Sequence, residues 1–520
     1  MPNTAHLPWP ETFVFWDAGA TAQLGMPPTA QLGNVVKELL STSDLEKTIA
    51  GENCLRSYQK SLTNFLKTVQ KPLQDLHDAN DFALRQIYDF EALRLVSQKL
   101  GGAEGYEFLT GLYNLIDYGI HTPSGIIIPK DDGGVEVLLA ERLRGARNLL
   151  DLFSILSLSG AYLDIAENNP SKLQPYINFA EILAELMSDE GVALNDLRCA
   201  YGLPESFLAS RNFYLFSYAI GSLNYESVFL WLLFNAHKKA NDFPSCIGKY
   251  NRGIKLFHDF ATFFGIKKIG ENKDVVDSVW YPYNEPVAQR LNSHNEGHSV
   301  ARIGKFYYPH GNVNFRECPS CGKLNISFGS EWNYFSKSLF AEPPFGKEGG
   351  EQPCEFCGYK LKPHNNALIF QTSFKGGHAP FLEEIQRDMK VCVQNARHVV
   401  LLGYTLPADD LVWRTALTAK MNGEKYCSVV VGYRGPDKWL YGNELNSYIS
   451  DHDNDSDRDC FGVAAIKNAI QVFGEDKVRA YTAGIPQVWS DGKEAIREML
   501  FPKEFFKENI LEERVKRCRY

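Results

Sequence analysis

The spacing of apolar residues predicts a strand near the start of the chain and a long helical region after it. Thr12 to Trp16 is a short apolar run followed by small residues, which predicts a buried strand and a tight turn. From about Val35 to Ser210, apolar residues recur at the three- and four-residue intervals of a helix, as in Leu143 to Ile165. We therefore expect a large helical insertion after the first strand and turn.

Later apolar runs predict further strands, with helical patterns between several of them. These segments are Asn212–Leu223, Ala367–Phe370, His398–Tyr404, Cys427–Val431 and Lys477–Tyr481. Such alternation favours a parallel sheet covered by helices. The turn-rich stretch from Tyr118 to Gly134 predicts either a connection within the helical region or a small hairpin. The expected fold is α/β, with a Rossmann-like parallel sheet assembled from discontinuous segments.

The composition is that of a folded protein. Of the 520 residues, 44% are hydrophobic and 22% are charged, which excludes disorder, collagen-like repeats and coiled-coil architecture. At about 150 residues per domain, the length predicts two to four compact units. The 54 basic and 63 acidic side chains give a formal charge of −9, without the basic field that nucleic-acid binding needs. We expect no direct nucleic-acid partner.

Targeting and membrane signals are absent from the sequence pattern. The N-terminus has no basic segment followed by an apolar one, so no secretory signal is predicted. The stretch most easily mistaken for a membrane span, Asn212 to His237, is interrupted by Asn224 and Glu226. The acidic segment Ser450 to Asp459 lacks the Gly and Glu that an EF-hand requires, which favours a solvated loop. We expect a cytoplasmic protein without a membrane segment.

Four of the eleven cysteines form two Cys-x-x-Cys-Gly pairs. They are Cys318 with Cys321, and Cys354 with Cys357. Such turns direct each pair of thiols at one tetrahedral zinc ion, and the 32 residues between the pairs must loop out. Four thiolates leave no coordination position for a substrate, so we expect a structural zinc module and chemistry elsewhere. The other seven cysteines are scattered thiols.

Three further motifs accompany the cysteine pairs. His310-Gly311 lies just before the first pair, and the turn Ala18-Gly19-Ala20-Thr21, with Gly25 after it, follows the first strand. Asn224 lies at a predicted strand end, within Ser222 to Glu226. In chain order, the turn, Asn224, the His-Gly motif and the cysteine pairs resemble the corresponding features of sirtuin-like proteins. The later strand and turn from Val399 to Asp410, with Gly403, Tyr404 and Thr405, are similar to a Gly-Tyr-Ser-Leu-Pro turn in the bacterial branch of these proteins.

The resemblance implies a sirtuin-like, Rossmann-like fold that hydrolyses NAD to nicotinamide and ADP-ribose. Asn224 would hold the ribose and an attacking water, and His310 would contact the ribose hydroxyls as general base, near its ordinary pKa of about 6.5. NAD would be bound by Ala18, Gly19, Ala20, Thr21, Gly25, Gly403, Tyr404 and Thr405. Physical reasoning favours the same place, because ligands of open α/β sheets bind outside the carboxyl ends of the strands.

The apolar pattern and the resemblance, which leaves the helical region and the C-terminal tail unmatched, together predict a domain plan. The expected segments are 10–34 (first strand and NAD-binding turn), 35–210 (helical insertion), 211–305 (sheet continuation with Asn224 and a connecting segment), 306–366 (His310 motif and zinc module), 367–500 (C-terminal half of the sheet) and 501–520 (charged helical tail). In biological terms the resemblance implies the effector of a bacterial antiphage defence system of the abortive-infection type. A protein partner that senses infection, or a nucleotide signal, would activate it, and the helical insertion would act in assembly of a homo- or hetero-oligomer or in gating.

Other interpretations stay open. Asp17 stands where the family has the first Gly of Gly-Ala-Gly, and Leu-Asn-Tyr-Glu replaces the Gln-Asn-Ile-Asp of the deacylases, which disfavours deacylation. Asn224 is also suited to cap a helix that begins near Ser227, and His258 is a competing histidine without an adjacent glycine. The alternative functions are an NAD-dependent protein deacylase and a non-catalytic subunit that senses NAD or ADP-ribose.

Overall fold

The computed structural model describes most of the chain. The described residues are 10–129, 133–202, 218–230, 232–233, 236, 254–259, 299–326, 352–354, 357–361, 365–370, 379–408, 410–419, 423–432, 435–452, 461–506 and 512. Much of the acidic segment Ser450 to Asp459 and most of the tail 501–520 therefore lie outside the described residues, as do residues 212–217 of one predicted strand.

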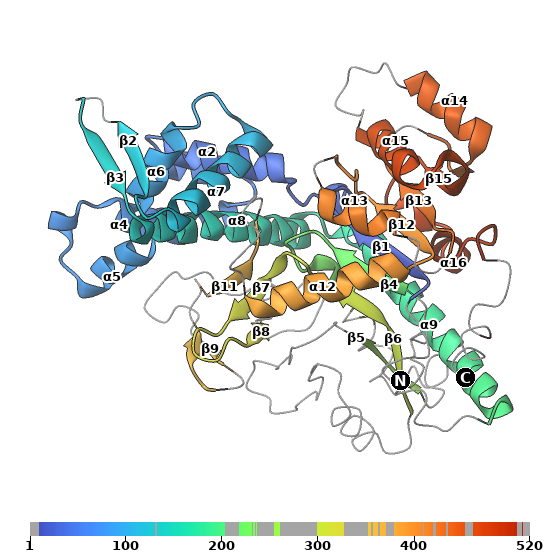
Figure 1. Ribbon diagram of the computed structural model, residues 1–520. Coiled ribbons are helices and arrows are strands. Elements are labelled where there is room, and N and C mark those ends of the chain that lie inside the picture. Colours follow the sequence, from blue (N-terminus) through green and yellow to red (C-terminus); the bar gives the residue numbers. More distant parts are fainter. Residues whose placement is uncertain are drawn as a thin grey trace.

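An eight-stranded sheet lies at the centre of the described chain (Figure 1). All neighbouring strands are parallel except β14, which pairs antiparallel with β15 at one edge. The order across the sheet is β14 (Trp439–Leu440), β15 (Val478–Tyr481), β13 (Tyr426–Val430), β12 (His398–Leu402), β1 (Thr12–Trp16), β4 (Tyr218–Ser222), β6 (Ser299–Tyr307) and β5 (Ile254–Asp259). The α/β class and the parallel sheet predicted from the sequence are confirmed.

The order of the strands reverses between β1 and β12. The chain passes from β1 to β4 on one side, whereas it continues from β12 to β13 on the other. In register, Thr12 of β1 faces His398 on one side and Tyr218 on the other. Open α/β sheets bind ligands in the crevice outside the carboxyl ends of the strands where such a reversal occurs. The carboxyl ends of β1 and β12 are thus the place to examine for a site.

The predicted strands form where apolar runs are buried on both faces. Every residue of β1, β4 and β12 is buried, which is why their sequences are continuous apolar runs. The prediction that Ala367–Phe370 belongs to this sheet is wrong. The segment forms β11 (Asn366–Leu368) in a separate antiparallel sheet with β7 (Gly311–Glu317) and β8 (Leu324–Ile326). β5, β6 and β7 were not predicted, because their polar residues interrupt the apolar pattern.

The predicted turn after β1 forms a short helix, α1 (Ala18–Ala22). The helical region that follows begins at Thr29, earlier than the predicted start near Val35. The stretch Tyr118 to Gly134 contains the end of a helix and one side of a hairpin, β2 (Ile126–Pro129) with β3 (Val135–Leu138). The helices of this region are α2 (Thr29–Ser41), α3 (Leu45–Gly51), α4 (Gln59–Gln70), α5 (Ala79–Ile87), α6 (Phe90–Gln98), α7 (Gly105–His121), α8 (Ala140–Asn168) and α9 (Gln174–Ala200). We call these elements, with the hairpin, the helical block.

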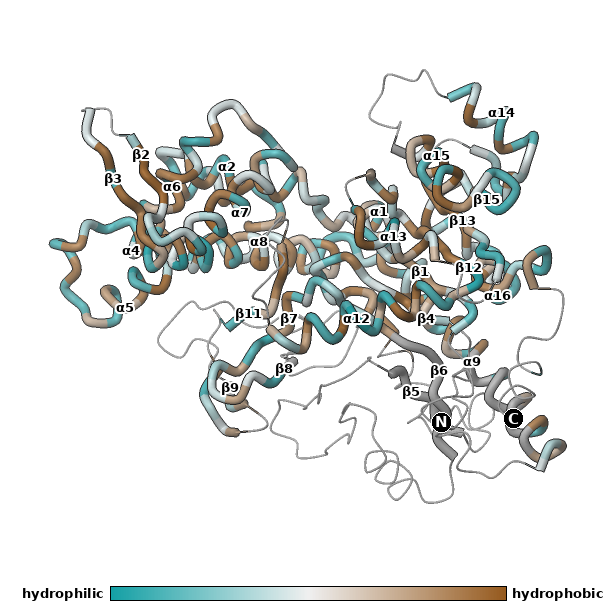
Figure 2. The backbone as a smooth tube through the Cα atoms, viewed as in Figure 1, coloured by the Kyte–Doolittle hydropathy of each residue, from teal (hydrophilic) through white to brown (hydrophobic). Residues whose placement is uncertain are grey.

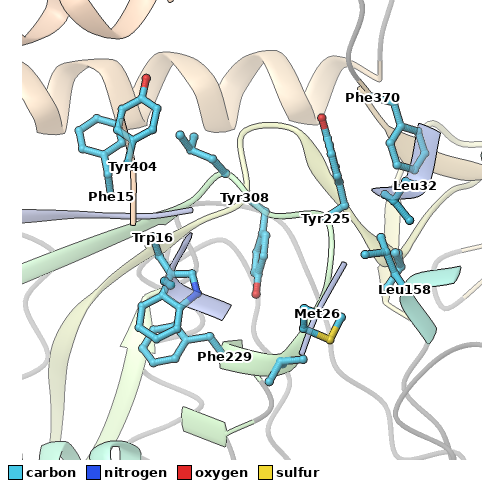
Figure 3. Packing of buried hydrophobic residues seen from close by; sticks show 14 of the residues in the cluster. Phe15, Trp16, Met26, Leu32, Leu158, Tyr225, Phe229, Tyr308, Phe370 and Tyr404 are labelled. Atoms are coloured by element: carbon cyan, nitrogen blue, oxygen red, sulfur yellow. The ribbon is translucent and has the colours of Figure 1, made fainter. Parts of the chain in front are cut away.

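The helical block and the sheet share one hydrophobic core. Figure 3 shows Trp16 of β1 against Phe229, and their rings stack with centroids 3.9 Å apart. Phe179 of α9 packs on Phe229 at 5.8 Å, which brings the block onto the sheet. α8 is long and apolar enough to cross a membrane by length and composition, yet 83% of its apolar window is buried inside the protein, as in the core helix of a soluble protein.

The C-terminal half supplies the helices that accompany β12, β13 and β15. They are α12 (Pro380–Asn395), α13 (Leu411–Thr418), α14 (Gly442–His452), α15 (Phe461–Phe473) and α16 (Lys493–Leu500). α12 begins with Pro380 at its first position, which suits proline because that N–H has no partner within the helix.

Candidate functional site

Two glycine turns meet backbone to backbone at the carboxyl ends of β1 and β12. Gly19 N donates to Gly403 O at 3.2 Å, and Asp17 N donates to Leu402 O at 3.2 Å. A Cβ on Gly19 would lie 2.6 Å from Gly403 O. Gly403 has φ +67, and a Cβ there would lie 2.1 Å from Ala20 N. Only glycine fits at either position, because a side chain would collide with the backbone of the other turn. The two predicted NAD-binding turns are thus in direct contact.

The other predicted residues of the first turn divide between open and covered positions. Gly19 is exposed and Ala18 is half-buried, whereas Ala20 and Thr21 are buried. Ala20 O accepts a hydrogen bond from the Tyr176 hydroxyl of α9 at 2.8 Å, so the helical block contacts the turn directly. Gly25, with φ +106, lies beside Ile165 of α8 and beside Lys172, which lies between α8 and α9.

The second turn is held by its own neighbours. The Tyr404 ring stacks on Phe15 at 5.3 Å (Figure 3), and its hydroxyl donates to Asp410. Thr405 O accepts from the Asn468 amide at 3.0 Å. Leu406 follows with φ 48, the one non-glycine residue of the described chain in the left-handed region. Such strained backbone persists where the surroundings hold it, often at functional sites.

Asn224 contacts the first turn. β4 ends at Ser222, and Leu223 N donates to Trp16 O at 2.9 Å, which continues the pairing with β1. Asn224 Nδ2 then donates to Thr21 Oγ1 at 3.2 Å and to Glu226 Oε1 at 2.9 Å. The predicted catalytic asparagine and the predicted nucleotide turn, 203 residues apart in sequence, are joined by a hydrogen bond.

Glu226 is a residue of the site that the sequence analysis missed. Its side chain is buried, with 3% of the residue exposed, and Oε2 accepts from Val228 N at 2.6 Å. Burial raises the pKa of its carboxyl to about 7, against the opposing effect of hydrogen bonds from Val228, Asn224 and Thr21. It is Glu226, not Asn224, that caps the helical segment at residues 228–230. The sequence did contain a signal for this residue, namely an acidic side chain two positions after the asparagine at the strand end.

His310 lies in the turn between β6 and β7. Gly311 has φ +75, and a Cβ there would lie 1.9 Å from Ala367 O, which requires glycine beside the histidine. His310 O accepts from Ile369 N at 2.8 Å. The half-buried imidazole has its centroid 6.2 Å from that of Tyr225, the residue next to Asn224. The turn of His310 and the segment of Asn224 are therefore neighbours.

Hydrogen bonds from β7 hold these two segments together. Val313 N donates to Tyr225 O at 2.8 Å, and Asn312 Nδ2 donates to Glu226 O at 2.9 Å. Ser227 Oγ donates to Asn312 Oδ1. Asn312 and Ser227 are fully buried, so water does not compete for these hydrogen bonds. The bonds therefore fix the two segments relative to each other. The competing His258 belongs to β5, separated from β1 by β4 and β6.

Asp17 lies at the carboxyl end of β1, where the family resemblance expects glycine. Loss of surrounding water raises the pKa of its carboxyl to about 6, and the negative charge of Asp410 adds to that effect. The Ala18 N–H acts in the opposite direction. The Asp17 carboxyl therefore changes its charge between about pH 5 and pH 7. At the upper end of this range an anionic ligand at the turn would meet the negative charge of Asp17 as well as that of Asp410.

The four predicted metal ligands form a compact cluster. The sulfur atoms of Cys318, Cys321, Cys354 and Cys357 all lie within 4.8 Å of one another, close enough to bind a metal ion. Two of the Sγ–Sγ distances, Cys318 to Cys357 and Cys321 to Cys354, are 3.6 Å. A tetrahedral ion with metal–sulfur bonds of about 2.3 Å places its sulfurs about 3.8 Å apart. The donor set fits one ion.

The backbone around the cysteines is built for this arrangement. Each pair is followed by a glycine in the left-handed region, Gly322 at φ +66 and Gly358 at φ +75. Each glycine N–H returns to the first cysteine of its pair, Cys318 O or Cys354 O, at 2.8 Å. Apart from the cysteines, the small buried cluster of this module contains only Leu361 among the described residues. So few apolar side chains among the described residues are compatible with a module that a bound metal ion stabilises.

Comparison with known proteins adds no relative. No model of a known protein family matches the chain, and no curated protein matches it. The resemblance to sirtuin-like proteins stays a prediction.

Proposed function

We propose that this protein is an NAD hydrolase that cleaves the bond between nicotinamide and ribose, releasing nicotinamide and ADP-ribose. The observation that carries the proposal is the hydrogen bond between Asn224 and Thr21, which joins the proposed catalytic residue to the proposed nucleotide turn. The motifs of His310 and Gly403 follow the carboxyl ends of β6 and β12 in the same parallel sheet. Convergence of four strand ends at a reversal of strand order is typical of nucleotide sites.

The chemistry needs positioning more than a strong acid. Departure of nicotinamide leaves an oxocarbenium-like ribose, which a water molecule attacks, and the water loses a proton as ADP-ribose forms. Asn224 would hold the ribose and the water through its carboxamide. His310, in a turn set by Gly311, would accept the proton. The turn at Gly19, which is exposed and has no side chain, leaves room for the pyrophosphate to approach.

We assign zinc to the four-cysteine cluster. Thiolate ligands in a tetrahedral arrangement favour Zn²⁺, and a fully occupied coordination shell serves folding and not catalysis. The ion would be held by Cys318, Cys321, Cys354 and Cys357, and Asn325 Nδ2, 3.4 Å from the Cys354 sulfur, would stabilise its negative charge.

The helical block is assigned to assembly or gating in a cytoplasmic antiphage effector that a partner or a nucleotide signal activates. Its contact with the site through Tyr176 supports this role. The two strands of its hairpin are hydrophobic (Figure 2). Ile127, Val135 and Val137 of the hairpin, and Leu139 just after it, are 46–64% exposed. Exposed apolar surface is typical of interaction sites. Light scattering after size exclusion tests the role, and a constitutive, fully active monomer would contradict it.

The central test is chromatography of nicotinamide and ADP-ribose after incubation of the protein with NAD. We expect turnover by the wild type and its loss in Asn224→Ala and in His310→Ala. Turnover that survives in both variants would overturn the site assignment. If the wild type is inactive, calorimetric titration with NAD separates a gated enzyme or a sensor, which binds, from a protein with no NAD site. Release of O-acetyl-ADP-ribose from an acetylated peptide would instead identify a deacylase.

A further inference from the structure

Both amide hydrogens of Asn224 are engaged inside the protein. One is donated to Thr21 Oγ1 at 3.2 Å and the other to Glu226 Oε1 at 2.9 Å. Asn224 Oδ1 receives no hydrogen bond from the described part of the chain. Since a carboxamide has two hydrogens and one oxygen, Oδ1 is the polar atom of this side chain left to face a ligand.

We propose that Glu226 is a positioning residue that sets the orientation of the Asn224 carboxamide for the proposed NAD hydrolysis, an inference that rests on that function. An ionised carboxylate only accepts hydrogen bonds, so it binds the NH₂ group of Asn224 and repels the oxygen. The Asn224 side chain is thereby held with Oδ1 as the acceptor for the ribose hydroxyl or the attacking water. A neutral residue at position 226 would allow the amide to rotate by 180° and present its NH₂ group instead.

Glu226 is itself held in place by the surrounding chain. Its second oxygen, Oε2, accepts from Val228 N at 2.6 Å, and its carbonyl accepts from Asn312 Nδ2 at 2.9 Å. Both side-chain oxygens are therefore acceptors, which is the arrangement of an ionised carboxylate. Because the Glu226 carboxylate is held in place by Val228 N, it can hold the Asn224 carboxamide in one orientation.

Among the described residues, the titratable groups whose pKa the Glu226 charge affects are three buried tyrosines. They are Tyr162 of α8, Tyr176 of α9 and Tyr308, which follows β6, and the Glu226 charge adds to the effect of burial in raising the pKa of each hydroxyl. Among the described residues no lysine or arginine forms an ion pair with Glu226. Burying a carboxyl group without a cationic partner costs folding free energy, and a neutral capping residue would cost less. A functional role of the Glu226 charge in the site explains why a charged residue stands here.

The test compares Glu226→Gln with Glu226→Asp and with the wild type in NAD hydrolysis at pH 6 and pH 8. At pH 8 we expect Glu226→Gln to lower kcat by about tenfold or more, with a smaller change in KM, because the substrate still binds but Asn224 is misdirected. Glu226→Asp keeps an acceptor-only carboxylate and should retain more kcat than the glutamine variant. Wild-type kcat should rise with ionisation of Glu226 between the two pH values, and this component should be absent in Glu226→Gln.

A matched control is Asp78→Asn, because Asp78 caps α5 in the helical block and, like Glu226, accepts from the N–H two residues on, that of Asn80, at 2.8 Å. Its kcat should equal that of the wild type. If wild-type turnover depends on Asn224 but Glu226→Gln keeps kcat within twofold and the same pH profile, the role of Glu226 is overturned and the hydrolase stands. If the wild type neither hydrolyses NAD nor binds it in calorimetry, the proposed function fails, and the role of Glu226 fails with it.

Discussion

Replacing Glu226 by glutamine should change how the stability of the protein depends on pH. The pKa of the Glu226 carboxyl is raised by burial from 4.5 to about 7 in the folded protein. The folded state therefore binds this proton more tightly than the unfolded chain. The resulting stabilisation is fully present below pH 4.5 and is lost as the pH rises through about 7.

The size of the effect follows from the difference between the two pKa values. Each pKa unit corresponds to about 1.4 kcal/mol, so the full loss is about 3 kcal/mol, of which about 2.5 kcal/mol falls between pH 5 and pH 8. Glutamine has no proton to lose. The free energy of unfolding of Glu226→Gln minus that of the wild type should therefore rise by about 2.5 kcal/mol from pH 5 to pH 8.

Urea unfolding followed by tryptophan fluorescence at the two pH values measures this difference. Other titrating groups cancel in the comparison of variant with wild type. Asp44→Asn is the control, because Asp44 caps α3 by accepting from Lys47 N at 3.1 Å but is exposed. A difference for Glu226→Gln that stays the same at pH 5 and pH 8 would refute the burial of an uncompensated carboxyl beside Asn224.

Three further outcomes follow from the structure. Gly403→Ala should destabilise the protein by about 3 kcal/mol or more in urea unfolding, because its Cβ would lie 2.1 Å from Ala20 N; Gly101→Ala, with φ +55 and open space around it, should cost only about 1 kcal/mol, and equal costs would contradict the contact between the turns. Cys318→Ser should lower the zinc content measured by mass spectrometry from one ion per chain, whereas the exposed Cys199 changed to serine should not; unchanged metal in both would exclude the cluster as the zinc site. Tyr176→Phe should weaken NAD binding in calorimetry by about fivefold through the lost hydrogen bond to Ala20 O, and unchanged affinity would show that the block does not support the turn.

Local pattern was sufficient for the elements that are buried on both faces. β1 and β12 are continuous apolar runs and were predicted within two residues, because a strand covered on both sides needs no polar positions. Mixed strands such as β6, with Arg302 and Lys305 among its residues, show no such run and were missed. The strand at Ala367–Phe370 was found, but its pairing with β7 in a separate sheet depends on partners distant in the sequence.

The sequence by itself determined the α/β class, the helical block and the two cysteine pairs, since apolar periodicity and ligand spacing are properties of short segments. It also supplied Asn224, His310 and the glycine turns as candidates. Only the tertiary structure decided that Gly19 contacts Gly403, that Asn224 donates a hydrogen bond to Thr21, and that Glu226 is buried against Asn224. These contacts join residues up to several hundred positions apart, and they form only when β4 and β12 pair on opposite sides of β1.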